Sequence, residues 1–207
     1  MSDNLLVYLV DDDQAVLDSL TGLLSAAQRE MRQFLSAESF LRTLDESSAC
    51  CVVTDLKMTG MSGQDLLHTL KAGDYLLPII VVTGHATVPV TVELMYSGAV
   101  TLLEKPYKPA ELLKAVDQAL KLYVELRAER DETVLIQKRL DSLTADEFRV
   151  AHLLVDGATN KAVSEDMEIS MRTVDRRRSI VLGKMQAKSV PDLARMLTLL
   201  QERTRNQ

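Results

Sequence analysis

The sequence contains few cysteines and no long hydrophobic run. Its only two cysteines, Cys50 and Cys51, are adjacent, which is poor geometry for a disulfide and provides no metal-ligand spacing, so we expect two buried apolar thiols. Apolar runs such as Leu76 to Val82 fall far short of the ~20 residues that a membrane-spanning helix requires. The polar residues 2–4 lead straight into a strand pattern, without the basic start and apolar run of a secretory signal. We therefore predict a cytoplasmic protein without a membrane partner.

Length and charge predict two domains. The chain has 207 residues, of which 46% are hydrophobic and 26% charged. This composition is globular rather than disordered or fibrous, and the chain exceeds one typical domain of roughly 100 to 150 residues. Residues 1–120 hold 8 basic and 16 acidic side chains, whereas residues 121–207 hold 16 and 14. Between Ser170 and Lys188, six basic residues accompany a single acid, Asp175. Such a stripe is either a solvated face or a nucleic-acid interface.

Strand and helix patterns alternate over the first 120 residues. The β-rich or apolar runs are residues 5–10, 31–35, 51–54, 79–83 and 100–103, and the helical patterns are 16–27, 37–44, 64–72, 88–97 and a segment after Pro109. This alternation predicts an α/β domain with a doubly wound, five-stranded parallel sheet. Three of the strands are continuously apolar, as expected for strands that are buried on both faces. A ligand site is expected beyond the carboxyl ends of the strands.

Residues 110–141 contain neither glycine nor proline, which predicts one long helix that leaves the first domain. Apolar residues at alternating spacings of three and four indicate a partner-helix role, although Glu129 and Thr133 interrupt the stripe. A surface helix or a flexible connector is the alternative. The stripe consists of Leu112, Ala115, Ala119, Leu122, Leu126, Glu129, Thr133, Ile136, Leu140 and Leu143.

The remaining residues predict a small all-α domain. Thr144 and Glu147 form a capping-box pattern that begins a helix, which Gly157 ends. Further helices are expected over residues 160–167, from Ser170 to about residue 185, and over residues 190–201. A short helix, a three-residue break and a basic helix form the pattern of a helix-turn-helix, which favours nucleic-acid binding.

Charged and hydroxyl side chains stand at or just after the strand ends of the first domain. They are Asp11, Asp12, Asp13, Asp55, Thr83 and Lys105. In a parallel sheet these positions converge at one edge, where clustered carboxylates require a hard cation such as Mg²⁺. A carboxylate beside Mg²⁺, a hydroxyl and an ammonium group can act as a nucleophile toward a phosphoryl group. Helix capping is the alternative for the acids at 11–13, but it does not account for the residues at the other strand ends.

Segments in both halves of the chain resemble a known family. VYLVDDD, VVTDLKMTGMSG, VVTGHATVPV and LLEKPYKP resemble the receiver domain of two-component response regulators, and the segment from Leu143 to Ser189 resembles the LuxR-type helix-turn-helix. Together they are similar to the NarL/FixJ family. The resemblance implies a receiver domain over residues 1–121, a helical linker over 122–141 and a LuxR-type DNA-binding domain over 142–207.

The resemblance also implies roles for the strand-end residues. Asp55 corresponds to the phosphoacceptor, Thr83 to the switch hydroxyl and Lys105 to the residue that contacts the phosphoryl group. Asp13 would cap the first helix. The implied ligands of a Mg²⁺ cofactor are Asp11, Asp12, Asp55 and the main-chain carbonyl of Lys57.

Two positions depart from the family pattern. Thr59 stands where the family usually has proline, a change expected to loosen the loop after Asp55. Leu102 stands where a switch aromatic is common, so coupling through rotation of an aromatic ring is in doubt. Neither residue supplies a charge to the site, so the phosphorylation chemistry is less affected.

In the family the third helix of the C-terminal domain enters the major groove. Positions three and four apart share one helix face, so the residues expected to face bases are Arg172, Asp175, Arg176 and Ser179. The residues assigned to phosphates, which position the domain without reading sequence, are Thr173, Arg177, Arg178 and Lys184, with Lys161 on the preceding helix. An ordinary amphipathic basic helix is the alternative.

The resemblance implies a DNA-binding transcriptional response regulator that a sensor histidine kinase phosphorylates on Asp55 to change dimerisation and promoter binding. Its expected partners are the kinase, double-stranded DNA and a second copy of the chain when phosphorylated, with RNA polymerase as a further candidate. Apart from Mg²⁺-dependent self-phosphorylation and slow self-dephosphorylation, no enzymatic activity is expected. The alternative is a phosphorylation-independent DNA-binding or scaffold protein whose receiver binds a partner.

Overall fold

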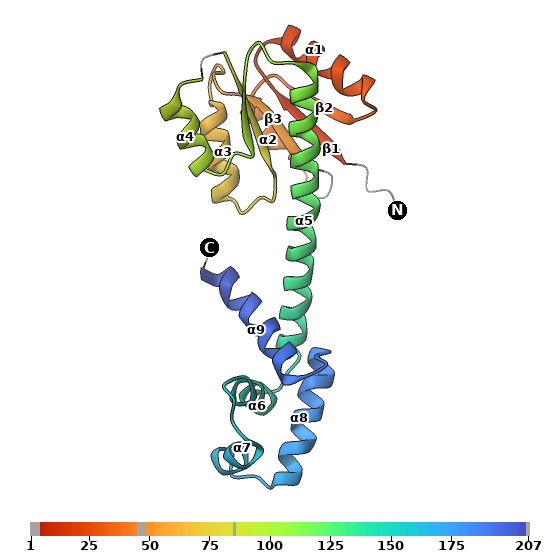
Figure 1. Cartoon of the computed structure of the whole chain (residues 1–207), viewed down its shortest axis with the longest axis vertical. Coiled ribbons are helices and arrows are strands. Elements are labelled where there is room, and N and C mark those ends of the chain that lie inside the picture. The colour runs from red at the N-terminus through yellow and green to blue at the C-terminus, as the bar shows by residue number, and fades with distance from the viewer. Residues whose placement is uncertain (1–4, 45–48, 85, 206–207) are drawn as a thin grey trace. The chain divides into compact units, whose positions relative to one another are not determined.

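The computed structural model describes residues 5–44, 49–84 and 86–205. Residues 2–4, on which the prediction about a secretory signal rests, lie outside this part. Contacts within the backbone divide the chain into two units, Met1–Arg127 and Ala128–Gln207. Figure 1 gives the element labels used below.

The first unit contains a five-stranded parallel sheet with the strand order β2-β1-β3-β4-β5. Its elements are β1 (Leu6–Val10), α1 (Gln14–Ala26), β2 (Glu30–Phe34), α2 (Ala37–Thr43), β3 (Ala49–Asp55), α3 (Gly63–Ala72), β4 (Ile79–Thr83), α4 (Val88–Tyr96), β5 (Thr101–Glu104) and the first part of α5 (Pro109–Asp141). The predicted doubly wound α/β fold is confirmed. Its order makes β2 and β5 the edge strands.

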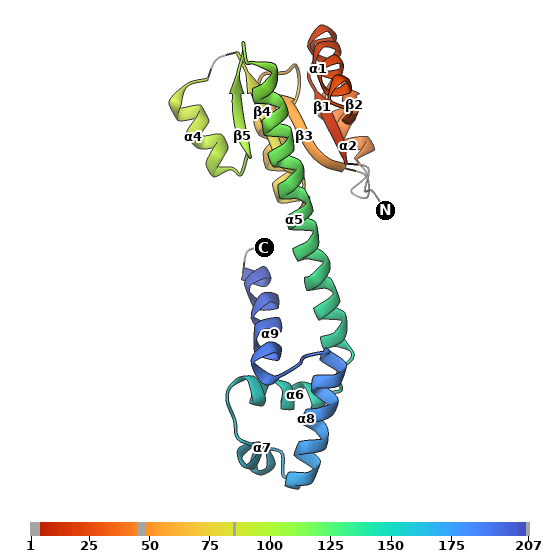
Figure 2. The same cartoon turned by 45° about the vertical axis from the view of Figure 1, so that its right-hand side comes forward.

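Helices cover both faces of this sheet (Figures 1 and 2). α1 and α5 share one face, where Arg29 just after α1 forms a 2.7 Å ion pair with Asp117 of α5. On the other face, Gln64 of α3 donates a 2.6 Å hydrogen bond to Glu93 of α4. The central strands β1 and β4 are buried along their whole length, as their continuous apolar runs predict. Both cysteines are buried in β3.

Helix α5 takes part in two separate hydrophobic cores. Near its start, the stripe residues Leu112, Ala115 and Ala119 are buried against the sheet. Farther along, Ile136 is only 1% exposed in the core of the second unit, and Leu140 packs against that core. The apolar stripe is therefore not one continuous seam for a partner helix, because its two ends are occupied by the cores of the two units.

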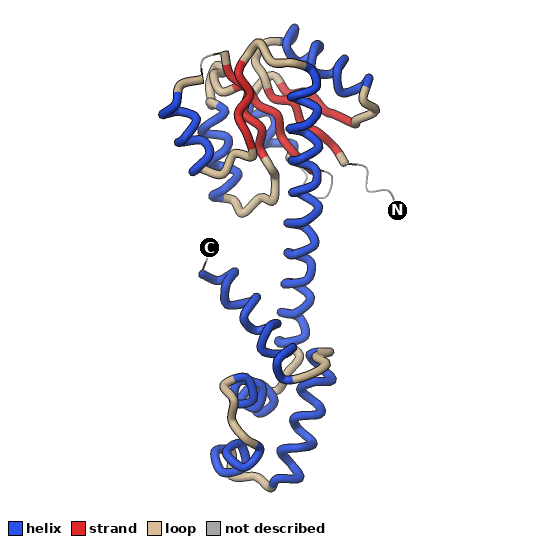
Figure 3. The backbone as a smooth tube through the Cα atoms, viewed as in Figure 1, coloured by secondary structure: helices blue, strands red, loops and turns tan. Residues whose placement is uncertain are grey.

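The described residues of the second unit form helices joined by loops (Figure 3). After the end of α5 these helices are α6 (Ala145–Val155), α7 (Asn160–Asp166), α8 (Met171–Met185) and α9 (Val190–Arg205). The predicted capping box is present, because Thr144 accepts from the Glu147 N–H and Glu147 accepts from the Thr144 N–H. Gly157 follows α6 with a φ of 84°, a left-handed conformation that glycine adopts without strain.

Among the described helices, none combines the length and the apolar character that crossing a membrane requires.

Candidate functional site

The predicted strand-end residues Asp11, Asp55 and Lys105 meet at the carboxyl edge of the sheet. The Nζ atom of Lys105 lies 2.7 Å from Oδ1 of Asp55 and 3.3 Å from Oδ2 of Asp11. The second oxygen of Asp55 accepts a 2.6 Å hydrogen bond from the Lys57 N–H. Asp55 ends β3 and Lys105 follows β5, so the parallel strands deliver both residues to one edge. The Asp55 carboxylate is thereby held between a cation and a main-chain donor.

Burial and charge determine the ionisation of this cluster. Burial raises the pKa of Asp11 above its ordinary value, although the Asp13 N–H and Lys105 oppose this effect. Burial by itself lowers the pKa of Lys105, but the hydrogen bond to Asp55 and the charges of Asp11 and Asp55 outweigh it, so this pKa is raised. Lys105 is therefore an ammonium ion at neutral pH. It can offset negative charge on a phosphoryl group that approaches Asp55.

The carboxylate of Asp12 contacts the loop after β3. Its Oδ2 accepts a 2.7 Å hydrogen bond from the Thr59 N–H, and this bond lowers the pKa of Asp12. A proline at position 59 could not donate this bond because it has no N–H. Thr59 therefore anchors the loop to Asp12, where the departure from the family pattern suggested a looser loop.

The oxygen donors at this edge suit Mg²⁺. Asp11, Asp12, Asp55 and the Lys57 carbonyl carry hard oxygen donors, and Lys105 neutralises only one of the three carboxylate charges. Within residues 5–44, 49–84 and 86–205, no three acidic, histidine or cysteine side chains are arranged so that they could hold a metal ion. The magnesium site therefore stays a prediction that rests on the chemistry of its donors. Asp13 caps α1 as expected, because its side chain accepts from the Ala15 N–H.

The two residues implied in signal transmission lie on β4 and β5. Thr83 is 1% exposed at the end of β4, and its carbonyl accepts a 2.7 Å hydrogen bond from the Lys105 N–H. Leu102 is partly buried and packs against the sheet core. A branched aliphatic side chain therefore occupies the place of the switch aromatic.

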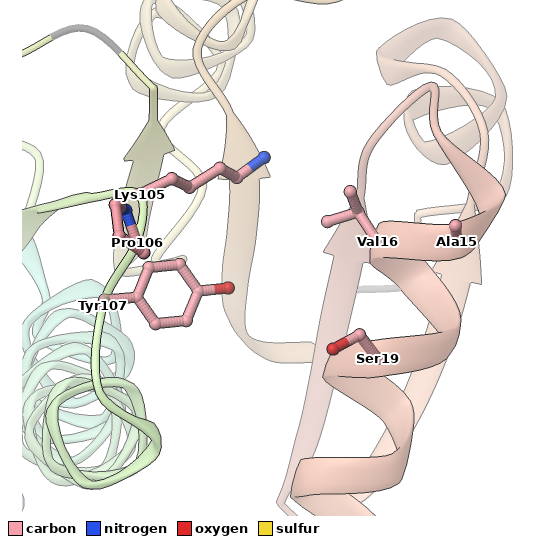
Figure 4. Close-up of a pocket in the computed structure, with 6 residues that line it drawn as sticks. All are labelled: Ala15, Val16, Ser19, Lys105, Pro106 and Tyr107. Carbon is pink, nitrogen blue, oxygen red and sulfur yellow. The ribbon is translucent and has the colours of Figure 1, made fainter.

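A hollow of about 360 Å³ lies beside Lys105, between α1 and the segment after β5. Figure 4 shows Tyr107 on one side of it, with the hydroxyl group directed toward α1. Burial raises the pKa of Tyr107. The sequence pattern does not single out this residue, although its position two residues after Lys105 was a usable signal. The hollow is lined by Ala15, Val16, Ser19, Lys105, Pro106 and Tyr107.

The predicted base-facing residues occupy one exposed side of α8. They are Arg172, Asp175, Arg176 and Ser179. The other side of the helix is fixed in the core by Val174, Val181 and Met185, each fully buried. Ser170 caps α8 as predicted, since its side chain accepts from the Thr173 N–H.

Some of the predicted phosphate contacts are paired within their own domain. Arg177 lies 2.6 Å from Asp146 at the start of α6, and its side chain is 25% exposed. Lys184 lies 2.5 Å from Glu147 and donates a second hydrogen bond to the Ser142 carbonyl. Lys161 is 81% exposed and lies 3.9 Å from Glu165. Of these cations, Lys161 is the most accessible to a phosphate.

The Lys184–Glu147 ion pair makes the stability of the second unit depend on pH. The hydrogen bond from Lys184, followed by that from the Thr144 N–H, lowers the pKa of Glu147 below its ordinary 4.5. Because the folded state favours the charged carboxylate, Glu147 contributes to the free energy of unfolding above pH 4.5. This contribution is lost as the pH falls through the folded pKa. We expect Glu147→Gln to reduce this acid-dependent loss.

The free energy of unfolding is measured by urea titration at several pH values between neutral and acid. Hydrogen exchange of α6 and α8 reports on the second unit in the same pH range. Glu129→Gln, at an exposed position of α5, is the control that removes the same charge. If the stability of both variants depends on pH as strongly as that of the wild type, the Lys184–Glu147 ion pair does not cause the pH dependence.

Comparison with known proteins assigns both units. Residues 7–117 match the response regulator receiver domain, and residues 141–197 match the luxR family of bacterial regulatory proteins. The chain is a response regulator of the NarL/FixJ family. This response regulator belongs to the two-component, DNA-binding regulators of transcription, as predicted.

Relatives of this response regulator match it over nearly its full length. It is 39% identical over 199 residues to the transcriptional regulatory protein FixJ of Azorhizobium caulinodans, with 96% of this chain and 94% of that protein covered. It is 33% identical over 203 residues to the response regulator protein TodT of Pseudomonas putida, with 98% and 89% covered. Among solved structures, response regulator StyR is 33% identical with a TM-score of 0.81, and 94% and 98% of the two chains are covered.

Proposed function

We propose that a sensor histidine kinase phosphorylates this response regulator on Asp55 and thereby changes its dimerisation and its binding to promoter DNA in the cytoplasm. The observation that carries the proposal is the placement of Asp55 between the Lys105 ammonium and the Lys57 N–H. An Asp55 oxygen forms the new bond to phosphorus while the P–N bond of the phosphohistidine breaks, and the imidazole nitrogen leaves with the electron pair. The test is to measure phosphorylation and DNA affinity in the same sample.

Mg²⁺ is typical of receiver domains, and we assign its ligands to Asp11, Asp12, Asp55 and the Lys57 carbonyl. When bound, the ion supplies positive charge that offsets charge on the phosphoryl oxygens. Lys105 contributes a second positive charge from the protein itself, and we assign Thr83 as the hydroxyl that responds to the phosphoryl group. Beyond self-phosphorylation and slow self-dephosphorylation, we propose no catalytic activity.

Exposed apolar side chains support dimerisation through the region from α4 to α5. On α4, Val88 is 78% exposed and Tyr96 89% exposed, and Val92 and Met95 are 47% and 46% exposed. Burying such side chains against a second copy is favourable, since apolar surface leaves water. RNA polymerase is the further partner that promoter-bound protein would contact.

One observation favours the alternative function. Leu102 replaces the switch aromatic, so a receiver that binds a partner without phosphoryl transfer, on a constitutively DNA-binding chain, is the second candidate. The two functions differ in whether a phosphoryl group on Asp55 changes DNA affinity.

The DNA-binding role predicts different effects for two neighbouring arginines. Arg176 is exposed on the side of α8 assigned to bases, so Arg176→Ala is expected to lower discrimination between specific and random DNA by about 1–3 kcal/mol. Arg177 is paired with Asp146 and assigned to a phosphate, so Arg177→Ala should weaken both kinds of DNA alike and lower the salt slope by about one unit. Titrations at several salt concentrations compare the variants. Identical behaviour of the two variants would overturn the division of α8 into base-facing and phosphate-facing residues.

A further inference from the structure

Asp175 is the only acidic residue between Ser170 and Lys188, a segment that also contains six basic residues. It lies on the exposed side of α8, between Arg172 and Arg176. An acid at this position repels the phosphate backbone and so cannot serve general DNA affinity. We propose that Asp175 is a specificity-determining residue that accepts a hydrogen bond from the N4 amino group of a cytosine. This inference rests on the proposed DNA binding through α8.

The carboxylate of Asp175 is held in a defined orientation by a residue of another helix. The Asn160 side chain, at the start of α7, donates a 2.6 Å hydrogen bond from Nδ2 to Oδ1 of Asp175. This bond occupies one oxygen of the carboxylate and leaves Oδ2 for a further donor. Orienting an exposed side chain before binding removes part of the entropy cost of ordering it at the interface.

Arg178 determines which way the Asn160 amide points. Its NH1 atom lies 3.4 Å from Oδ1 of Asn160, so the amide oxygen faces the guanidinium group and the amide nitrogen faces the carboxylate. The reversed amide would place its oxygen against Asp175 and its NH₂ group against Arg178, with both contacts repulsive. Asn160 therefore acts as a positioning residue, which connects Arg178 to Asp175.

The chemistry of the carboxylate selects the base. An ionised carboxylate only accepts hydrogen bonds, and in the major groove guanine presents two acceptors, N7 and O6, that would repel it. Adenine offers its N6 amino group as a donor, but the neighbouring N7 is an acceptor and repels the second carboxylate oxygen. Cytosine presents its N4 amino group without an adjacent N7, so it is the base that suits Asp175.

The experiment is selection of bound sequences from a random DNA pool by the full-length protein. Asp175→Ala is expected to remove a cytosine preference at one position of each half-site, a loss of about fivefold or more. The same change should raise affinity for random DNA, because it removes a negative charge from a basic surface. Asp175→Asn should also remove the cytosine preference, because its amide oxygen keeps the bond from Asn160 and its NH₂ group, which only donates, then faces the base.

Asn160→Ala tests the positioning role. It should weaken the preference at the same position in the wild type, and it should have no further effect on that position in the Asp175→Ala background. A purely structural role would change thermal stability and all positions together. Glu165→Ala removes an exposed negative charge from α7 and serves as the control, which should leave every base preference unchanged.

The outcomes separate this inference from the proposed function. If the wild type selects no sequence at all, the proposed DNA-binding function fails. If the wild type selects a site and Asp175→Ala selects the same site with the same strength, Asp175 reads no base and the inference is overturned.

Discussion

Asp55→Asn is expected to abolish the acquisition of a phosphoryl group from a small acyl phosphate in the presence of Mg²⁺. The amide is a far poorer nucleophile than the carboxylate. It also removes the negative charge that contacts Lys105 at 2.7 Å, so the ammonium is left to Asp11. The measurement is the mass of the intact protein over time, compared with the wild type.

Asp13→Asn is the matched control for this substitution. It makes the same chemical change at the N-cap of α1, where asparagine caps as well as aspartate does, and it should leave phosphorylation unchanged. A third sample, the wild type with excess chelator, should not gain the phosphoryl group. A phosphoryl group on the Asp55→Asn variant, at whatever residue, would remove Asp55 from its assigned role.

Ile136→Ser is expected to destabilise the second unit by about 3–5 kcal/mol, because it creates a cavity in a core and buries a hydroxyl group there. Ile136 is 1% exposed and lies in the core formed with Val150 and Val174. Leu135 is the neighbouring residue on α5 and is 48% exposed, so Leu135→Ser should change stability by no more than about 0.5 kcal/mol. Urea unfolding of the full chain, with hydrogen exchange of α6 and α8, measures both effects.

The sheet gives an internal reference for this comparison. Hydrogen exchange of β1 and β4 should be unchanged in both variants, because their core contains other residues. Phosphorylation of Asp55 should also persist. Equal destabilisation by the two substitutions would show that the second part of α5 does not belong to the core of the second unit.

Much of the fold follows from local sequence signals. β1 and β4 are continuous apolar runs, and the structure buries both along their whole length. The capping signal at Thr144 and Glu147 locates the start of α6 because it depends on residues only three positions apart. The convergence of Asp11, Asp55 and Lys105 was also predictable, since parallel topology brings the ends of neighbouring strands to one edge.

Contacts between residues far apart in sequence were not predictable in this way. Lys184 was assigned to a phosphate from its place on a basic helix, but its ammonium contacts Glu147, 37 residues away. The bond from the Thr59 N–H to Asp12 spans 47 residues. Such partners depend on how helices and loops pack, which neither charge patterns nor periodicity encode.

The packing of helix α5 likewise could not be predicted from the sequence pattern. The sequence predicted one long helix with an apolar stripe, and the helix is present from Pro109 to Asp141. Periodicity identifies an apolar face but not the surface that covers it. The structure assigns Leu112 to the first core and Ile136 to the second, so a substitution intended to disturb a helix–helix contact at Ile136 would instead damage a domain core.

The central proposal is that phosphorylation of Asp55 controls DNA binding. The most direct measurement is to incubate the full chain with Mg²⁺ and a small acyl phosphate, then determine its mass, its oligomeric state and its DNA affinity in the same sample. We expect one phosphoryl group, a shift toward dimer and a change in DNA affinity of about 5- to 150-fold, the usual range of coupling between two sites. One phosphoryl group on Asp55 with unchanged oligomeric state and unchanged DNA affinity would contradict the proposal.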